Sequence, residues 1–86
     1  MPEISRFSGI IIAMYYNDHP PPHFHARLGD FEIRVNILNG DIISGYLPKP
    51  AESMVREWWQ LHRQELLTDW RLARERAQLR KIAPLE

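Results

Sequence analysis

One dipeptide, Gly29-Asp30, constrains the fold of this chain more than any other feature, because it lies between two segments in which apolar and polar residues alternate. The flanking segments are residues 23–28 and 31–38. Alternation with a period of two is typical of strands that bury one face, and a Gly-Asp pair between two such segments favours a tight hairpin turn. The centre of the chain therefore predicts an antiparallel hairpin.

A two-residue turn also fixes the register of this hairpin. Each pair that it sets face to face is then either apolar on both strands or polar on both strands, which a shifted register would not give. The apolar pairs are Leu28–Phe31, Ala26–Ile33 and Phe24–Val35, and the polar pairs are Arg27–Glu32, His25–Arg34 and His23–Asn36. We expect the polar pairs to share a face that lies away from the core.

Two further segments extend the predicted sheet to about four strands, arranged as two hairpins. Residues 9–16 form a β-branched and aromatic run that suits a buried strand. The Asn39-Gly40 dipeptide is a strong turn signal and leads into a strand over residues 41–47. The sequence does not decide which face of this last strand is buried, because a one-residue bulge would exchange its inward and outward side chains.

The second half of the chain predicts a helical segment, with Pro50 suited to its first turn. Apolar residues recur there at intervals of three and four positions, as on one face of a helix. This stripe comprises Ala51, Val55, Trp58, His62, Leu66, Trp70, Ala73 and Ala77. One helix of roughly 40 Å and two packed helices broken near residues 62–64 are both open. Residues 1–86 thus predict a single α+β domain, and residues 81–86 are expected to fray or to dock on a partner.

Composition excludes several classes of protein. The chain has 86 residues, no cysteine, and eleven basic against eleven acidic residues. Disulfides and thiolate zinc sites are therefore excluded, and a generic nucleic-acid coat is disfavoured. The sequence shows neither a leader pattern nor an apolar run of membrane-spanning length. We expect a cytoplasmic protein without a membrane partner, and its shallow core leaves pairing of two copies open.

The segment His19-Pro-Pro-Pro-His23-Phe-His25 carries the strongest chemical signal. Its prolines hold His19 at a set distance from the other two histidines, because each ring locks φ near −65°. Imidazole exchanges protons near neutral pH, and its neutral form ligates metal ions. The segment is therefore consistent with an acid–base site, an anion-binding edge, or a metal site that His19 or Asp18 would complete.

The predicted neighbours of the histidines favour an anion over a metal. Arg34 would lie across from His25 and Arg27 beside it, and fixed guanidiniums oppose a cation at close range. Arginines bind phosphate oxygens while histidines move protons, so the patch suits metal-independent cleavage of a phosphodiester without any cofactor. The alternative is a solvated sheet face with cross-strand charge pairs. The candidate catalytic residues are His23, His25 and His19, the phosphate-binding residues Arg34 and Arg27, and the supporting residues Glu32 and Asn36.

The helical segment offers three further candidates. His62 lies on the apolar stripe, so we expect a partly buried, hydrogen-bonded histidine rather than a ligand. Trp59 lies about 100° around the helix from the stripe and is a candidate interface with a protein partner. The basic residues within 71–81 complement the helix dipole, or alternatively contact a nucleic-acid backbone.

Several segments together resemble a small bacterial family catalogued as a domain of unknown function, number four-one-six-zero in its series. They are residues 1–7, 9–12, 14–25, 58–62 and 65–70. The resemblance implies a gene that commonly lies beside a second short gene, of family two-four-four-two, in the manner of a toxin–antitoxin pair. Some relatives carry a label of transcriptional regulator. The arginine-rich residues 74–80 depart from the family, where relatives have a glycine-containing turn.

These observations lead to one expected function and two alternatives. We expect a toxin-like component of a two-gene module that binds RNA, cleaves it without a metal, and pairs with a small cognate protein encoded by a neighbouring gene. The first alternative is a non-enzymatic module that binds this protein or DNA and regulates its own operon. The second is a metal-binding hydrolase.

Overall fold

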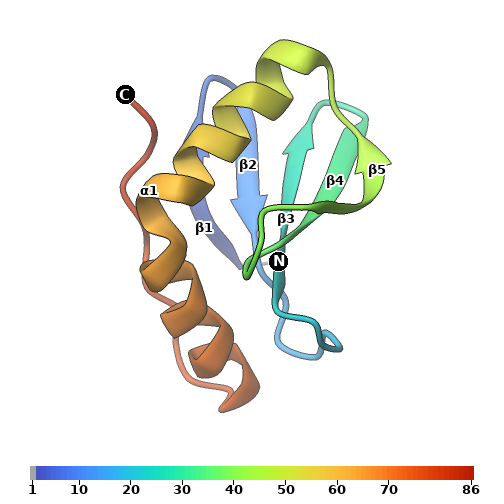
Figure 1. The fold of residues 1–86 in the computed structure, drawn as a ribbon. Coiled ribbons are helices and arrows are strands. Elements are labelled where there is room, and N and C mark those ends of the chain that lie inside the picture. The colour runs from blue at the N-terminus through green and yellow to red at the C-terminus, as the bar shows by residue number, and fades with distance from the viewer. Residues whose placement is uncertain (1) are drawn as a thin grey trace.

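A computed structural model describes residues 2–86 as a five-stranded antiparallel sheet followed by one long helix (Figure 1). Each strand pairs with the next along the chain, in the order β1-β2-β3-β4-β5. The elements are β1 (Glu3–Phe7), β2 (Ile10–Ala13), β3 (His23–Leu28), β4 (Phe31–Asn36), β5 (Ile42–Tyr46) and α1 (Lys49–Arg74). The α+β prediction is confirmed, with one strand more than expected. In the part of the chain described, no helix combines the length and apolarity that a membrane crossing requires.

The unexpected strand is β1, which pairs with β2 across a two-residue turn. Phe7 lies opposite Ile10, and the turn residues Ser8 and Gly9 both have positive φ. Ser-Gly is a known turn dipeptide, so a signal for this hairpin was present in the sequence. A register shift between Glu3 and Ser5 interrupts the alternation of β1, which hides the strand from a pattern search.

The β3–β4 hairpin has the predicted register. Leu28 lies opposite Phe31 at the turn, and His23 lies opposite Asn36 at the far end. Phe24 and Ala26 are fully buried on the side covered by α1, as the apolar pairs require. Turn chemistry and side-chain alternation were therefore sufficient to set the register of this hairpin.

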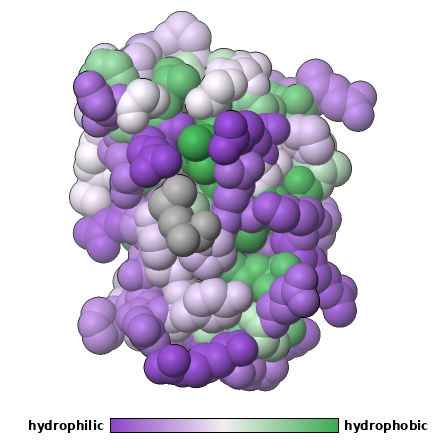
Figure 2. Space-filling view, turned by 180° about the vertical axis from the view of Figure 1, so that it is seen from behind, coloured by the Kyte–Doolittle hydropathy of each residue, from purple (hydrophilic) through white to green (hydrophobic). Residues whose placement is uncertain are grey.

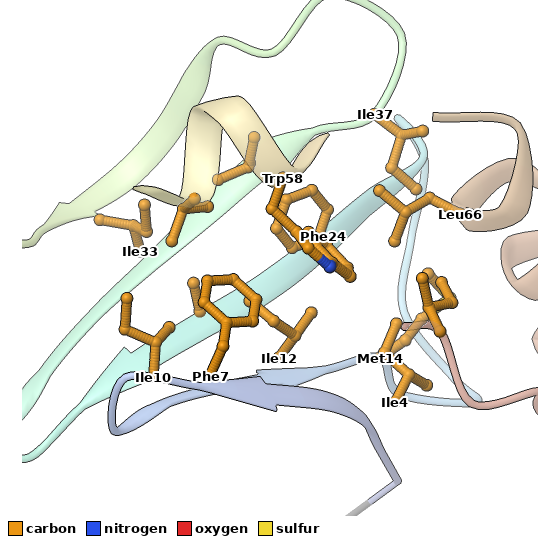
Figure 3. Close-up of a cluster of buried hydrophobic side chains, with 14 of the residues drawn as sticks. Ile4, Phe7, Ile10, Ile12, Met14, Phe24, Ile33, Ile37, Trp58 and Leu66 are labelled. Carbon is orange, nitrogen blue, oxygen red and sulfur yellow. The ribbon is translucent and has the colours of Figure 1, made fainter. Parts of the chain in front are cut away.

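Trp58 lies at the centre of the core between α1 and the sheet (Figures 1 and 3). Its ring centroid lies 5.6 Å from that of Phe7 and 5.7 Å from that of Phe24. The helix continues past a kink at His62, where φ is −123° and ψ is 22°. The one-helix and two-helix alternatives thus resolve into one bent helix. His62 is partly buried and its Nδ1 donates to Glu65 Oε1 at 2.6 Å, as expected of a histidine that is not a ligand.

A bulge decides the faces of β5. The register shifts beside Val35, so that Ile43 is the extra residue of the strand. Beyond the bulge Leu47 is buried and Tyr46 is exposed, as the bulged alternative requires.

The C-terminal tail, residues 75–86, returns along α1 toward β1 (Figure 1). The backbone N–H of Ile82 donates to the carbonyl of Ile4 at 2.8 Å, and Ile82 is buried. The indole Nε1–H of Trp58 donates to the carbonyl of Ala83 at 2.9 Å. The expectation that residues 81–86 fray or dock on a partner is therefore wrong, because these residues complete the core of their own chain.

A buried carboxyl group, that of Asp69, anchors the tail to α1. Its Oδ1 accepts a hydrogen bond from the backbone N–H of Arg80 at 2.8 Å. Its Oδ2 is buried and has no hydrogen-bond partner within the described residues. Burial raises the pKa of the Asp69 carboxyl above its ordinary value, and the N–H of Arg80 offsets this only in part.

The Asp69→Asn variant is expected to gain stability relative to the wild type as the pH rises. The raised pKa means that the folded state holds the Asp69 proton more tightly than the unfolded state does. The resulting penalty is absent below the unfolded-state pKa of about 3.9, grows between that value and the raised folded-state pKa, and stays constant above both. Urea unfolding between about pH 4 and pH 7.5 measures the difference. Parallel pH profiles for the two proteins would contradict the prediction.

Candidate functional site

Three polar side chains from the predicted histidine segment meet where β3 begins. His23 and His25 lie on the same side of β3, with ring centroids 5.3 Å apart. The loop of residues 17–22 contains a cis peptide bond between two of its prolines and brings Asp18 back to both rings. We call Asp18, His23 and His25 the histidine cluster.

A single carboxylate oxygen joins the histidine cluster. Asp18 Oδ2 lies 3.1 Å from His23 Nε2 and 3.0 Å from His25 Nε2. His23 is only 3% exposed and its ring packs against Trp70. The ring of Tyr15 packs edge-on to His25, whose side chain is 12% exposed. The imidazoles are therefore shielded, while the half-buried Asp18 side chain, 27% exposed, leaves the cluster open to solvent.

The Nδ1 atom of each ring has a partner outside the cluster. His23 Nδ1 lies 2.8 Å from the carbonyl oxygen of Pro21, which can only accept, so this nitrogen carries the proton. His25 Nδ1 lies 3.1 Å from Glu32 Oε2 on β4. Since a neutral imidazole has one N–H, Nε2 of neutral His23 presents a lone pair to the cluster.

His23 Nε2 is a buried polar atom without a hydrogen bond among the described residues. It lies within hydrogen-bonding distance of Asp18 Oδ2, but the direction does not suit a hydrogen bond. Two electron-rich atoms therefore lie 3.1 Å apart, and the lone pair of His23 Nε2 has no partner among the described residues.

The structure corrects the expectation that the polar face of the hairpin is solvated at His23. The helix is much longer than the strands it covers, so its second half extends past the N-terminal end of β3, where His23 lies. Trp70 on that half reaches His23, with ring centroids 5.4 Å apart. Trp70, which was predicted to lie in the core, thus covers His23, which was predicted to lie on the face away from the core.

The two arginines lie at the backbone positions that the register predicts. Arg34 lies opposite His25, but its side chain is exposed and its Nε donates to Ser44 Oγ at 2.9 Å. Arg27 is half-buried on β3, two positions beyond His25. The charged group in contact with His25 on β4 is the carboxylate of Glu32. The Nε of Arg34 is therefore engaged with β5, and a carboxylate rather than a guanidinium contacts the His25 ring.

The remaining candidates lie outside the cluster. His19 is exposed in the proline loop, and its ring is not among the three converging groups. Asn36 uses its Oδ1 to accept the backbone N–H of Leu38 at 2.8 Å, which stabilises the turn after β4. Asp18, which the sequence offered only as a substitute metal ligand, is the residue that joins the two histidines.

Trp59 has a role within its own chain. Its indole Nε1–H donates to the carbonyl of Ile37 at 2.7 Å, and its ring lies against Gly40. These contacts account for its half-buried state. Its use as an interface with a protein partner stays a prediction.

The basic C-terminal end of α1 and the residues after it reach the cluster loop through one side chain, that of Arg76. Arg71 and Arg74 are exposed on the last turn of α1, and Arg76 donates to Asn17 Oδ1 at 2.9 Å, next to Asp18. The face seen from behind is mostly hydrophilic, with apolar residues in small separate patches (Figure 2).

Comparisons with known proteins give one match. A family model described as Domain of unknown function (DUF4160) matches residues 9–71, which include the whole histidine cluster. No curated protein and no solved structure shows a significant match to the chain.

Proposed function

We propose that this chain, which belongs to the domain-of-unknown-function family DUF4160, is the toxin-like component of a two-gene module. We propose further that it binds and cleaves RNA at the histidine cluster. The observation that carries the proposal is that one nitrogen of each imidazole lies within 3.1 Å of Asp18 Oδ2, in a shielded position. Such groups, held rigidly and open to solvent on one side, are typical of reactive centres.

RNA supplies its own nucleophile, which suits a site as small as this one. The 2′-oxygen attacks the adjacent phosphorus and forms the new P–O bond, while the bond to the 5′-oxygen breaks. The proton lost by the 2′-hydroxyl is taken up at the site, and a proton is delivered to the departing 5′-oxygen. The cluster can promote this reaction through its imidazoles alone or through a metal ion that they hold.

The basic side chains near the cluster support RNA as the substrate. The exposed Arg71 and Arg74 can contact phosphates, and the bond between Arg76 and Asn17 joins this basic end of α1 to the cluster loop. Contacts of this kind position a strand without reading its sequence. A hydrophilic surface with only small apolar patches also fits a charged polymer (Figure 2).

Induction of the wild-type gene alone is expected to arrest bacterial growth, and the His23→Ala/His25→Ala variant is expected to abolish the arrest. Growth curves and RNA profiling after induction measure both effects. Because alanine at the buried His23 leaves a cavity, Asp18→Asn serves as a second loss-of-function variant. His62→Gln removes an imidazole outside the cluster and should still arrest growth.

The neighbouring gene provides a further readout of the same proposal. Co-expression of the small protein that it encodes is expected to relieve the arrest. Unimpaired growth with the wild-type gene would instead favour the non-enzymatic binding module. A gel shift on the promoter of the module, with and without the neighbour protein, would then test that alternative.

A further inference from the structure

We infer that Asp18, His23 and His25 bind one divalent transition-metal ion. The inference deepens the proposed function, because it assigns a cofactor to the same cluster. Two imidazole nitrogens and one carboxylate oxygen are a common donor set for zinc and for non-haem iron. The ligand atoms of the three residues all lie within 4.8 Å of one another.

The spacing of the donor atoms fits one shared ion. Ligands about 2.1 Å from a metal and about 90–110° apart around it lie about 3.0–3.4 Å from each other. Asp18 Oδ2 lies 3.1 Å from His23 Nε2 and 3.0 Å from His25 Nε2. Both distances to Asp18 Oδ2 suit ligands of one shared ion, and the donor atoms of the two imidazoles lie within 4.8 Å of each other.

The buried nitrogen of His23 provides an independent argument. Its Nδ1 donates to the Pro21 carbonyl, so the neutral ring has an unshared electron pair on Nε2, 3.1 Å from Asp18 Oδ2 but not directed at it. This nitrogen is buried and lacks a hydrogen bond among the described residues. A metal ion would accept electron pairs from both groups and turn their repulsion into shared coordination.

The surroundings of the cluster have the features of a supporting shell. Metal-bound histidines usually donate their other N–H to a carboxylate or a carbonyl, which fixes the ring orientation. Glu32 Oε2 lies 3.1 Å from His25 Nδ1, and the Pro21 carbonyl lies 2.8 Å from His23 Nδ1. Arg34 is engaged with Ser44, so its Nε is not directed at the cluster. The charged groups in direct contact with the two imidazoles are therefore the carboxylates of Asp18 and Glu32.

The donor set also limits the kind of ion. Calcium and magnesium prefer oxygen ligands throughout, whereas paired imidazoles with one carboxylate favour Zn²⁺ or Fe²⁺. Three protein ligands leave at least one position for water or substrate, as in catalytic rather than structural zinc sites. The partly exposed Asp18 side chain marks where that position opens to solvent.

Calorimetric titration of the full chain, purified without a histidine tag and freed of metal with a chelator, tests the inference. We expect one equivalent of Zn²⁺ to bind with a dissociation constant in the micromolar range or below, and Co²⁺ to give visible absorption bands. Asp18→Asn and His25→Gln should each weaken Zn²⁺ binding at least about 100-fold, because each removes a ligand. Glu32→Gln should weaken it about 10- to 100-fold, as expected of a positioning residue.

The control variant His62→Gln should bind Zn²⁺ like the wild type. Far-ultraviolet circular dichroism shows whether each variant is folded, and the melting temperature with and without Zn²⁺ gives a second readout. A zinc-dependent rise is expected for the wild type but not for His25→Gln. Failure of the wild type to bind Zn²⁺ or Co²⁺, or equal binding by folded Asp18→Asn and His25→Gln, would overturn the inference.

The outcome separates the metal site from the proposed function. Stoichiometric Zn²⁺ binding without growth arrest would keep the metal site and reject the RNA-cleaving toxin. Growth arrest by a folded protein that binds neither metal would keep the toxin and support proton exchange by the imidazoles alone. Arrest that depends on the same side chains as metal binding would support both.

Discussion

Replacing Trp58 with alanine is expected to remove about 3–5 kcal/mol of folding free energy. Trp58 is fully buried and packs against the rings of Phe7 and Phe24, from two different strands. Its indole N–H also donates to the carbonyl of Ala83, so the variant loosens the tail as well as the core. Since domains are stable by only about 5–15 kcal/mol, this is a large share of the total, and urea unfolding should show a strongly lowered midpoint.

Two further variants separate packing from the loss of the hydrogen bond. Trp58→Phe keeps most of the buried ring and is expected to lose about 1–2 kcal/mol, mainly through the unpaired carbonyl of Ala83. Leu61→Ala, at a helical position that is 65% exposed, should change stability by less than about 0.5 kcal/mol. A loss below about 1 kcal/mol in Trp58→Ala would show that Trp58 is not central to the core.

The register of the β3–β4 hairpin could be predicted pair by pair because local rules decide it. The turn at Gly29-Asp30 fixes the register, and alternation fixes the faces, so both can be read without knowing the rest of the fold. The strand β1 has a turn of the same kind at Ser8-Gly9. It was missed because its bulge breaks the alternation that would have identified it.

The histidine cluster could be predicted only in part, because its remaining determinants are not local. That His23 and His25 share a side follows from their spacing. The return of Asp18 depends on the path of the proline loop, and the cover provided by Trp70 depends on how far α1 extends beyond the sheet. Neither the path of the loop nor the extension of α1 beyond the sheet can be recognised from a periodicity or a motif in the sequence.

The hydrogen-bond partner of Arg34 could not be predicted, for a reason that lies in β5. The sequence left open whether that strand has a bulge, and the bulge sets Ser44 opposite Arg34. The Ser44 hydroxyl then accepts a hydrogen bond from Arg34 Nε. An ambiguity of one residue on an edge strand was thus sufficient to hide this partner.

The Gly45→Ala variant is expected to lose at least about 2 kcal/mol of folding free energy and to damage the cluster from a distance. Gly45 has a φ of +92°, and a Cβ at this position would collide with the backbone carbonyl oxygen of Glu32. Relief requires β5 to move away from β4, because a backbone atom cannot rotate aside as a side chain can. Urea unfolding measures the loss.

Gly29→Ala is the matched control, because it makes the same substitution at positive φ without a collision. The φ of Gly29 is +59°, and a Cβ added there would meet no heavy atom within 4 Å, so only the backbone strain of about 1 kcal/mol is expected. Glu32 holds His25 Nδ1. Displacement of Glu32 should therefore weaken Zn²⁺ binding in Gly45→Ala but not in Gly29→Ala. Equal stability and equal Zn²⁺ affinity of the two variants would contradict this coupling between the bulged edge strand and the histidine cluster.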